Sequence, residues 1–425
     1  MTLLQRLQAE GIQRKGSPER GFRYVTALGK PVTAAERARI EALVLPPAWT
    51  DVRIHPSPRA HLQAIGKDKA GRWQYRYHRS FRERQEARKY DRLVHFAEAL
   101  PKMRKTVQAH LRRPGLGREK VMAGILTILA NCFIRPGSQA YADEHGSYGL
   151  ATLRPKHVKV TGDTVHFDFP GKSGQQQAQS LRDRRVANLV RKLLQVPGRD
   201  LFKFIDEEGK VVDVRRRHIN AYIKELMGER FSAKDFRTWA GTLVAASALA
   251  RSAEELSAQK AGQEAEAVAR SIGAPPADRE AMKKRAAREA RERKRMVTAA
   301  VKEAAALLGN TPTVCRASYI YPSVLSAFDR GVVVQKYFLN VDELAQHRTF
   351  NLHPSEKALL ALLKTAPRGA IVASARARGR TTAAQQKARN ARDASRTRSA
   401  AGSMKRKTQR AQHRRTGRGA TRRSI

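Results

Sequence analysis

Five side chains that lie far apart in the sequence could together exchange one phosphate ester for another. A tyrosine phenol can act as the nucleophile, arginine and asparagine can donate to the phosphate oxygens, and a lysine ammonium can protonate the departing oxygen. Such a reaction requires no metal ion. The candidates are Arg135, Lys172, Arg237, Asn310 and Tyr319. Because the chain contains 84 Lys and Arg residues, spacing alone does not select these five.

The local sequence predicts where the first two candidates lie. Residues 121–134 are apolar, which is typical of a buried helix, and a proline follows Arg135. Since the residue before a proline is pushed out of the helical region, Arg135 is expected at the helix end. Farther on, Thr161-Gly162-Asp163 joins two alternating runs, which indicates a hairpin, and a tight turn follows at residues 171–174. Lys172 is therefore expected on a β turn.

Two further helices are predicted beside the remaining candidates. Residues 232–235 are typical of a capping box, which would place Arg237 in the first turn of the following helix. A cation at a helix N-terminus opposes the helix dipole, so Arg237 would favour an anionic partner. Gly309 suits the end of one helix, and Thr311 before a proline suits the start of the next, with Tyr319 about two turns inside it.

Five segments resemble the active-site segments of type IB DNA topoisomerases and occur in the family's order: NCFIRPGS, FPGKSG, KDFRTWAGT, LLGN and CRASYIYP. The resemblance is to the bacterial and poxvirus-like branch. It implies that Arg135 and Arg237 bind the scissile phosphate and that Lys172 protonates the leaving 5′ oxygen. It also implies that Asn310 donates to a non-bridging oxygen and that Tyr319 forms a 3′-phosphotyrosyl bond with DNA.

Two positions leave alternatives open. Poxviral and eukaryotic members have histidine where Asn310 stands, whereas bacterial members are similar to this chain. Asparagine can donate a hydrogen bond but never carries charge. Tyr321 lies two residues after Tyr319 and is the neighbouring candidate for the nucleophile. Without the resemblance, both tyrosines would be interpreted as core residues of a helical domain.

A second block of resemblance lies upstream, over residues 45–83. It resembles the N-terminal DNA-clamp domain of the bacterial branch, with the run QYRYH as its signature. On a strand, Gln74 and Arg76 would face one side and suit base edges, while Tyr75 and Tyr77 would face the other and suit the sugar-phosphate backbone. The simpler interpretation of the tyrosine pair is a half-buried strand face.

The charge of the chain indicates a polyanionic partner. The formal net charge is +46, from 84 Lys and Arg against 38 Asp and Glu. Residues 366–425 contain 18 Lys and Arg and one acid, Asp393, but the rest of the chain is strongly basic without them. Nucleic acid is therefore the leading class of partner. The resemblance implies that the partner is double-stranded DNA, enclosed by a monomer that clamps it.

Several other classes of protein and site are disfavoured. Cys132 and Cys315 are too few for a disulfide framework or a cysteine-rich zinc site, and they fit a reducing compartment. The first residues lack the apolar core of a signal peptide, and no apolar stretch is long enough to span a membrane. The FPGKSG segment is not a phosphate loop, because His166 stands where the first glycine is required. We expect no cofactor, no metal and no membrane association, and a cytoplasmic location on the nucleoid.

The order of elements predicts an α+β chain. Residues 23–78 are strand-rich, and residues 80–111 are typical of a charged helix that Pro101 should interrupt. Beyond Pro367 the chain is polar and without periodicity, which is typical of disorder.

These patterns predict three regions and one hinge, and the resemblance implies the functions of the first two regions. The expected regions are a β-rich DNA-binding clamp domain over residues 1–100, a mainly helical catalytic domain with a small β-hairpin sheet over residues 101–345, and a basic, largely disordered tail over residues 346–425. The catalytic domain should contain a charged helical arm at residues 251–296, broken near Gly273 to Pro276. The hinge is expected near residues 100–115.

Two other functions remain open at this point. Tyrosine recombinases share the Arg, Lys, Arg and Tyr chemistry on a related helical fold, but they usually have HxLR and LGH segments where this chain has KDFR and LLGN. A non-enzymatic nucleoid-binding protein would also explain the charge. Relaxation of supercoiled plasmid in EDTA without ATP separates these functions, because the expected chemistry uses neither metal nor nucleotide.

Truncation after residue 365 should weaken DNA binding and flatten its dependence on salt, while relaxation activity persists. The removed residues contain 18 Lys and Arg, and each phosphate contact that is lost removes about one unit of counterion release. Fluorescence anisotropy with a labelled duplex over a salt series measures the slope. An unchanged slope would show that this segment does not contact DNA.

Overall fold

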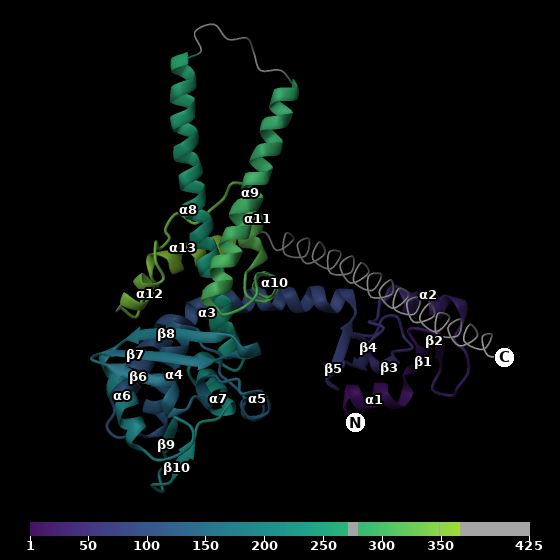
Figure 1. The fold of residues 1–425 in the computed structure, drawn as a ribbon, viewed down its shortest axis with the longest axis horizontal. Helices are drawn as coiled ribbons and strands as arrows, with labels where there is room; N and C mark the ends of the chain where they lie inside the picture. The colour runs from purple at the N-terminus through teal and green to yellow at the C-terminus, as the bar shows by residue number, and fades with distance from the viewer. Residues whose placement is uncertain (271–278, 348, 366–425) are drawn as a thin grey trace, which may run out of the picture. The chain divides into compact units, whose positions relative to one another are not determined.

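The computed structural model describes residues 1–270, 279–347 and 349–365 of the 425-residue chain (Figure 1). These residues belong to two compact units, Met1–Ala87 and the part of the chain from Arg88 to Thr365. The predicted disordered tail from residue 366 onward lies outside the described residues. No helix in the described part of the chain is long and apolar enough to cross a membrane.

The first unit is built on a five-stranded antiparallel sheet in the order β2-β1-β3-β4-β5. Its strands are β1 (Ile12–Ser17), β2 (Gly21–Val25), β3 (Thr50–Ile54), β4 (Leu62–Lys67) and β5 (Trp73–Tyr77), and its helices are α1 (Leu3–Glu10) and α2 (Ala34–Ala42). Capping boxes at Thr2 and Thr33 start the two helices. Small apolar clusters join the sheet to each helix, one through Leu7 and the other through Ile40.

The second unit is mainly helical and contains one three-stranded sheet in the order β6-β7-β8. Its helices are α3 (Arg79–Arg112, which begins in the first unit), α4 (Arg118–Cys132), α5 (Gln139–His145), α6 (Arg184–Gln195), α7 (Arg216–Met227), α8 (Ala233–Arg270), α9 (Arg279–Leu307), α10 (Pro312–Ser318), α11 (Pro322–Asp329), α12 (Asp342–Gln346) and α13 (Pro354–Thr365). Its strands are β6 (Val158–Thr161), β7 (Thr164–Pro170), β8 (Gln176–Arg182), β9 (Lys203–Ile205) and β10 (Val211–Asp213). The predicted α+β class, with a β-rich first part and a mainly helical second part, is confirmed.

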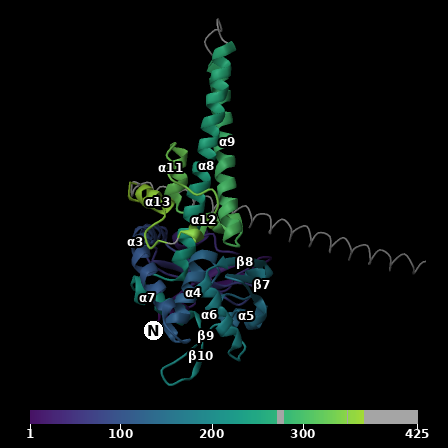
Figure 2. The same cartoon turned by 90° about the vertical axis from the view of Figure 1, so that its left-hand side faces the viewer.

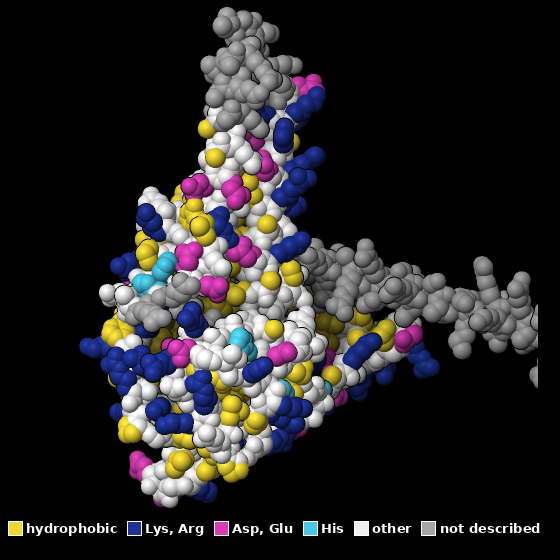
Figure 3. Space-filling model, turned by 60° about the vertical axis from the view of Figure 1, so that its left-hand side comes forward, with side chains coloured by type: hydrophobic (Ala, Val, Ile, Leu, Met, Phe, Trp, Pro, Cys, Tyr) yellow, Lys and Arg dark blue, Asp and Glu magenta, His cyan; other side chains and the backbone are white. Residues whose placement is uncertain are grey.

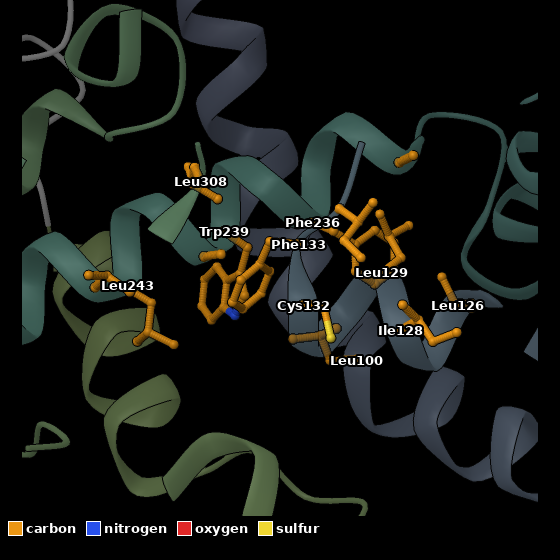
Figure 4. Close-up of a cluster of buried hydrophobic side chains, with 14 of the residues drawn as sticks. Leu100, Leu126, Ile128, Leu129, Cys132, Phe133, Phe236, Trp239, Leu243 and Leu308 are labelled. Atoms are coloured by element: carbon orange, nitrogen blue, oxygen red, sulfur yellow. The ribbon is translucent and has the colours of Figure 1, made fainter. Parts of the chain in front are cut away.

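Helix α4 is the centre of the second unit. Its sequence is apolar on all sides, as expected for a helix that is surrounded by protein, and it packs against α6, α7, α8, β8 and β9. Figure 4 shows side chains from the two central helices in this core, with Leu129 and Phe133 from α4 and its end, and Phe236 and Trp239 from α8. The predicted buried helix before Arg135 is therefore present.

Helices α8 and α9 pack against each other and extend beyond the core as a two-helix arm (Figures 1 and 2). This agrees with the charged helical arm expected from the sequence, although the predicted break near Gly273 lies outside the described residues. Figure 3 shows Lys and Arg side chains along one edge of the arm.

Pro101 does not interrupt α3, so that prediction was wrong. The helix is continuous from Arg79 to Arg112. Proline removes one backbone hydrogen bond and costs about 3 kcal/mol in a helix interior. Leu100 and Met103 are buried beside Pro101, and each buried side chain of this size contributes roughly 1.5–3 kcal/mol. Burial therefore offsets the cost of the proline.

The same burial argues against a hinge near residues 100–115. Leu100, Val107 and Leu111 belong to the main core of the second unit. The contact boundary between the units falls at Ala87 and Arg88, within α3, and not near residue 100.

Residues 354–365 form helix α13, although the sequence-based division assigned them to the tail. Leu359 and Leu363 of α13 are buried, and the helix packs against α8 and α11. Glu356 is also buried, and its carboxylate accepts two hydrogen bonds from Arg104 of α3, at 2.9 and 2.8 Å. The same carboxylate accepts from Trp239 Nε1 of α8 at 3.2 Å, so a single acidic side chain joins three helices.

The Glu356 carboxylate is held in its charged form. Burial alone would raise its pKa, but the charge and hydrogen bonds of Arg104, together with the backbone N–H of His353 and the Trp239 indole, outweigh burial and lower that pKa. Because the folded-state pKa lies below the ordinary carboxyl value, this stabilisation is present at neutral pH. It is lost as the pH falls through the folded-state pKa.

Replacing Glu356 with Gln should lower the free energy of unfolding of the second unit by about 2–3 kcal/mol at neutral pH, because Arg104 loses its charged partner. Denaturant unfolding followed by tryptophan fluorescence measures the change. The difference from wild type should shrink in acid. Lys364→Ala is the matched control, because its ion pair with Glu98 also joins α13 to α3 but is exposed. The control should cost less than about 1 kcal/mol, and equal losses in both variants would contradict the prediction.

Candidate active site

The end of α4 places Arg135. Phe133 caps the helix in the left-handed conformation, with φ of 53°, which turns the chain away from the helix axis. The turned segment is tied down by Leu150 N–H, which donates to Arg135 O at 2.9 Å. Gly149 permits this contact, because a Cβ there would lie 2.5 Å from Arg135 O. Arg135 thus stands on a fixed loop at a helix end.

Arg237, near the start of α8, is buried, with 3% of its surface exposed. Its guanidinium donates to the carbonyl oxygen of Phe133 and, at 2.7 Å, to that of Leu308. The capping interaction expected before it is present in part, because the Asp235 carboxylate accepts from the N–H and hydroxyl of Ser232. The Nε of Arg237 is buried and has no hydrogen-bond partner in the described part of the chain.

Asn310 follows the end of α9. Gly309 has φ of 56°, and Asn310 N–H donates back to Ala305 O at 2.9 Å, which closes the helix as the glycine predicted. The Arg135 guanidinium donates to Gly309 O at 2.8 Å and to Asn310 Oδ1 at 2.7 Å. Asn310 Nδ2 donates to Leu308 O at 3.2 Å, which leaves one of its two amide hydrogens for another acceptor.

Tyr319 lies at the C-terminal cap of α10, which begins after Thr311 as predicted. The Arg237 guanidinium carbon lies 5.1 Å from the centre of the Tyr319 ring. The Thr242 hydroxyl of α8 shares its one hydrogen between Thr238 O at 2.7 Å and Tyr319 O at 3.1 Å, and it accepts from Tyr321 N–H at 3.1 Å. Gly241 permits the close approach, because a Cβ there would lie 3.0 Å from Tyr319 O.

The two tyrosines have different surroundings. Tyr321 is buried in the main core, with 3% of its surface exposed, and burial raises the pKa of its phenol. Tyr319 is only partly buried and lies beside Arg237. The structure therefore brings Arg135, Arg237, Asn310 and Tyr319 together and leaves Tyr321 outside the group.

The electrostatics of this group favour an anion. Burial, followed by the charge of Arg237, lowers the pKa of Arg135 to about 10, so the guanidinium is still charged at neutral pH. Burial also lowers the pKa of Arg237, although the neighbouring Tyr319 phenol opposes the change. Among the described residues, neither arginine has a carboxylate partner. Two desolvated positive charges that share only neutral acceptors form a site that an anionic group would stabilise.

Lys172 stands on the turn between β7 and β8, as predicted. Gly171 N–H donates to Gln175 O at 2.8 Å across the turn, and Ser173 takes the left-handed conformation with φ of 63°. The Lys172 side chain is exposed and makes no hydrogen bond or ion pair with any described residue. The structure therefore does not bring Lys172 into contact with the other four candidates.

In the first unit, β5 is an edge strand that carries the predicted DNA-contact residues. Tyr75 and Tyr77 are 45% and 38% exposed, and their rings stack with centres 6.2 Å apart. Phe81 extends the row at 5.2 Å from Tyr77, and His61 stacks on Phe81, which the sequence did not indicate. The tyrosines thus share one face, as the strand alternation predicted.

The other two residues of β5 are less exposed. Gln74 Nε2 donates to the Asp68 carboxylate at 2.9 Å. Burial, together with repulsion from Arg82, lowers the pKa of the Arg76 guanidinium, which is partly buried. Arg76 is a desolvated cation without a described acidic partner.

Comparison with known proteins identifies the family. Residues 78–331 match the family profile described as eukaryotic DNA topoisomerase I, catalytic core, which is more than half of the chain. The chain belongs to the type IB DNA topoisomerases. Residues 21–68 match the profile of the bacterial DNA topoisomerase IB N-terminal domain, which places this topoisomerase in the bacterial branch. The predicted family and enzyme class are confirmed.

Individual relatives agree with the family. The DNA topoisomerase 1B of Acanthamoeba polyphaga mimivirus is 35% identical over 238 residues, which are 55% of this chain and 71% of the relative. The DNA topoisomerase 1B of vaccinia virus strain Copenhagen is 23% identical over 31% of this chain and 44% of the relative. A crystal structure of the XerH site-specific recombinase bound to its difH substrate aligns over 33% of this chain and 41% of that one. Its sequence identity is 14% and its TM-score is 0.23.

The family matches do not cover every feature of this topoisomerase. The N-terminal profile ends at residue 68 and the catalytic-core profile begins at residue 78. Between them lie Gln74, Tyr75, Arg76 and Tyr77. Their contact with DNA stays a prediction. No group of three or more His, Cys, Asp or Glu side chains that could hold a metal ion occurs in the described part of the chain.

Gly241→Ala should slow covalent adduct formation by roughly tenfold to a hundredfold without weakening DNA binding, because the added methyl group would displace Tyr319 by a few tenths of an ångström. Rates of adduct formation on a nicked duplex, followed by denaturing electrophoresis, measure the effect. Gly262→Ala makes the same chemical change farther along α8 and should leave the rate unchanged. Wild-type rates in both variants would show that Tyr319 does not depend on this contact.

Proposed function

We propose that Tyr319 of this type IB DNA topoisomerase attacks a backbone phosphorus and forms a 3′-phosphotyrosyl bond as the bond to the 5′ oxygen breaks. The duplex then swivels, and the 5′ hydroxyl attacks the phosphotyrosyl phosphorus to restore the strand and release the phenol. The energy of the broken phosphodiester bond is conserved in the phosphotyrosyl bond, so the cycle relaxes positive and negative supercoils without ATP. One observation carries the proposal: the buried Arg237 and the partly buried Arg135, neither of which has an acidic partner among the described residues, lie beside a partly exposed phenol.

The two arginines and Asn310 would bind the scissile phosphate. The Arg135 and Arg237 guanidiniums would stabilise the charge that develops on the non-bridging oxygens in the transition state. The remaining amide hydrogen of Asn310 would donate to one of these oxygens. Arg237 also lies beside the Tyr319 ring, so the cation that would hold the phosphate adjoins the attacking phenol, whose proton would pass to water.

Lys172 would be the general acid. Its ammonium would give a proton to the 5′ oxygen as the phosphorus–oxygen bond breaks, and the amine would take a proton from the 5′ hydroxyl during religation. An exposed lysine on a tight turn, free of other described partners, suits a group that must meet its substrate. The turn would therefore deliver Lys172 to the phosphate when DNA is bound.

The substrate would be duplex DNA, held by a monomer. The exposed Tyr75 and Tyr77 rings would contact the sugar-phosphate backbone, with Gln74 and Arg76 beside them on the same edge strand. The net charge of +46 supports binding through many phosphate contacts and a cytoplasmic location on the nucleoid. The charge alone would equally suit a non-enzymatic nucleoid protein, which plasmid relaxation in EDTA without ATP would contradict.

Tyr319→Phe should abolish the covalent protein–DNA adduct, because the variant lacks the attacking oxygen, and should leave the dissociation constant for duplex DNA within about threefold of wild type. Denaturing electrophoresis of a nicked-duplex reaction and peptide mapping of the trapped adduct measure the first effect. Tyr321→Phe is the matched control and should still form the adduct, because Tyr321 is buried in the core. An adduct in Tyr319→Phe, or its loss only in Tyr321→Phe, would move the nucleophile.

A further inference from the structure

The position of Lys172 is the least constrained part of the proposed site. The other four residues are fixed by hydrogen bonds at helix ends, whereas the lysine stands on an exposed turn of five residues between β7 and β8. Proton transfer requires donor and acceptor atoms within hydrogen-bond reach. Some contact must therefore set where this turn lies relative to the phosphate-binding arginines.

Gln177, the second residue of β8, makes such a contact. Its backbone is in register with Phe169 of β7, which is buried, so the base of the turn is fixed to the core. Its Cγ lies where Gly171 would carry a side chain, since a Cβ at Gly171 would be only 2.7 Å from it. Gln177 therefore packs directly against the residue that precedes Lys172.

The far end of the same side chain reaches the arginine site. A Cβ built on Gly309 would lie 2.5 Å from Gln177 Oε1 and 2.7 Å from Nε2, so the amide occupies the space beside that glycine. Gly309 is the residue whose carbonyl oxygen accepts from Arg135. One side chain thus spans from the Lys172 turn to the backbone that orients Arg135.

Both ends of this contact depend on glycine. At Gly309 the positive φ already favours glycine, and the amide of Gln177 adds a steric reason. At Gly171 the φ of −91° is ordinary, so the close approach of Gln177 is the reason that a side chain does not fit. Because Gly171 and Gly309 both lack a side chain, the space between them accommodates an unbranched side chain of the length of glutamine.

We propose that Gln177 is a positioning residue that seats the Lys172 turn against the Gly309 and Arg135 backbone, so that the acid reaches the 5′ oxygen when the arginines hold the phosphate. This inference rests on the proposed role of Lys172 as general acid. Gln177 does not touch the reacting atoms. It acts on one step only, the transfer of the Lys172 proton to the departing 5′ oxygen.

Replacing the 5′ bridging oxygen with sulfur isolates that step. A thiolate leaves without being protonated, because its conjugate acid is much stronger than an alcohol, so loss of the acid no longer slows cleavage. A defect in binding the phosphate or in orienting Tyr319 would persist with sulfur. The experiment compares single-turnover adduct formation on two duplexes that differ only in this atom.

With the oxygen substrate, Lys172→Ala should slow cleavage by about 10²–10⁴-fold and Gln177→Ala by at least about tenfold. With the sulfur substrate, both variants should cleave at close to the wild-type rate, which also shows that they are folded. Gln177→Met, which keeps the length of the side chain, should retain most of the rate on oxygen. Gln179→Ala is the matched control on the same face of β8, two residues farther from the turn, and should match wild type on both substrates.

The outcomes separate the inference from the function on which it rests. If the sulfur substrate restores the cleavage rate of Lys172→Ala but not that of Gln177→Ala, Gln177 acts on a step other than proton transfer. That result overturns the inference. A normal rate for Gln177→Ala on oxygen also overturns it. If sulfur fails to restore Lys172→Ala, the acid is a different group, and the proposed role of Lys172 falls before that of Gln177.

Discussion

The Arg237 guanidinium, buried between the carbonyl oxygens of Phe133 and Leu308, joins the ends of two helices to the start of a third. Backbone carbonyls at helix C-termini carry partial negative charge, so they solvate a cation without neutralising it. A carboxylate in the same place would satisfy the arginine and remove its affinity for phosphate. The choice of acceptor therefore keeps the positive charge of Arg237 inside the protein and still available to an anion.

This arrangement requires three backbones to meet within hydrogen-bond distance, and small residues make the approach possible. Gly149 admits the Arg135 loop, and Gly241 admits the cap of α10 against α8. The left-handed residue Phe133 turns its carbonyl toward Arg237. Two left-handed residues of the second unit, Phe133 and Ser173, thus lie next to candidate site residues, and so do the closely approached Gly149 and Gly241.

The sequence predicted elements better than contacts. The helix before Arg135, the turn at Lys172 and the glycine that ends α9 each have a local signal, because caps and turns depend on neighbouring residues. The continuity of α3 through Pro101 and the packing of α13 depend on burial against distant segments, which a local pattern does not contain. For the same reason Thr242 and Gln177 could not be selected in advance. Their contacts arise only where separate elements meet.

The Thr242 hydroxyl has a mechanical consequence. It bonds to the backbone on both sides of Ile320, through Tyr319 O and Tyr321 N–H, and it belongs to the buried first half of α8. In the covalent complex of a type IB enzyme, torque from the turning duplex pulls on the tyrosine that bears the DNA. With Tyr319 in that place, the force would pass through this hydroxyl into α8, so the anchor of the strand would be a long helix rather than a surface loop.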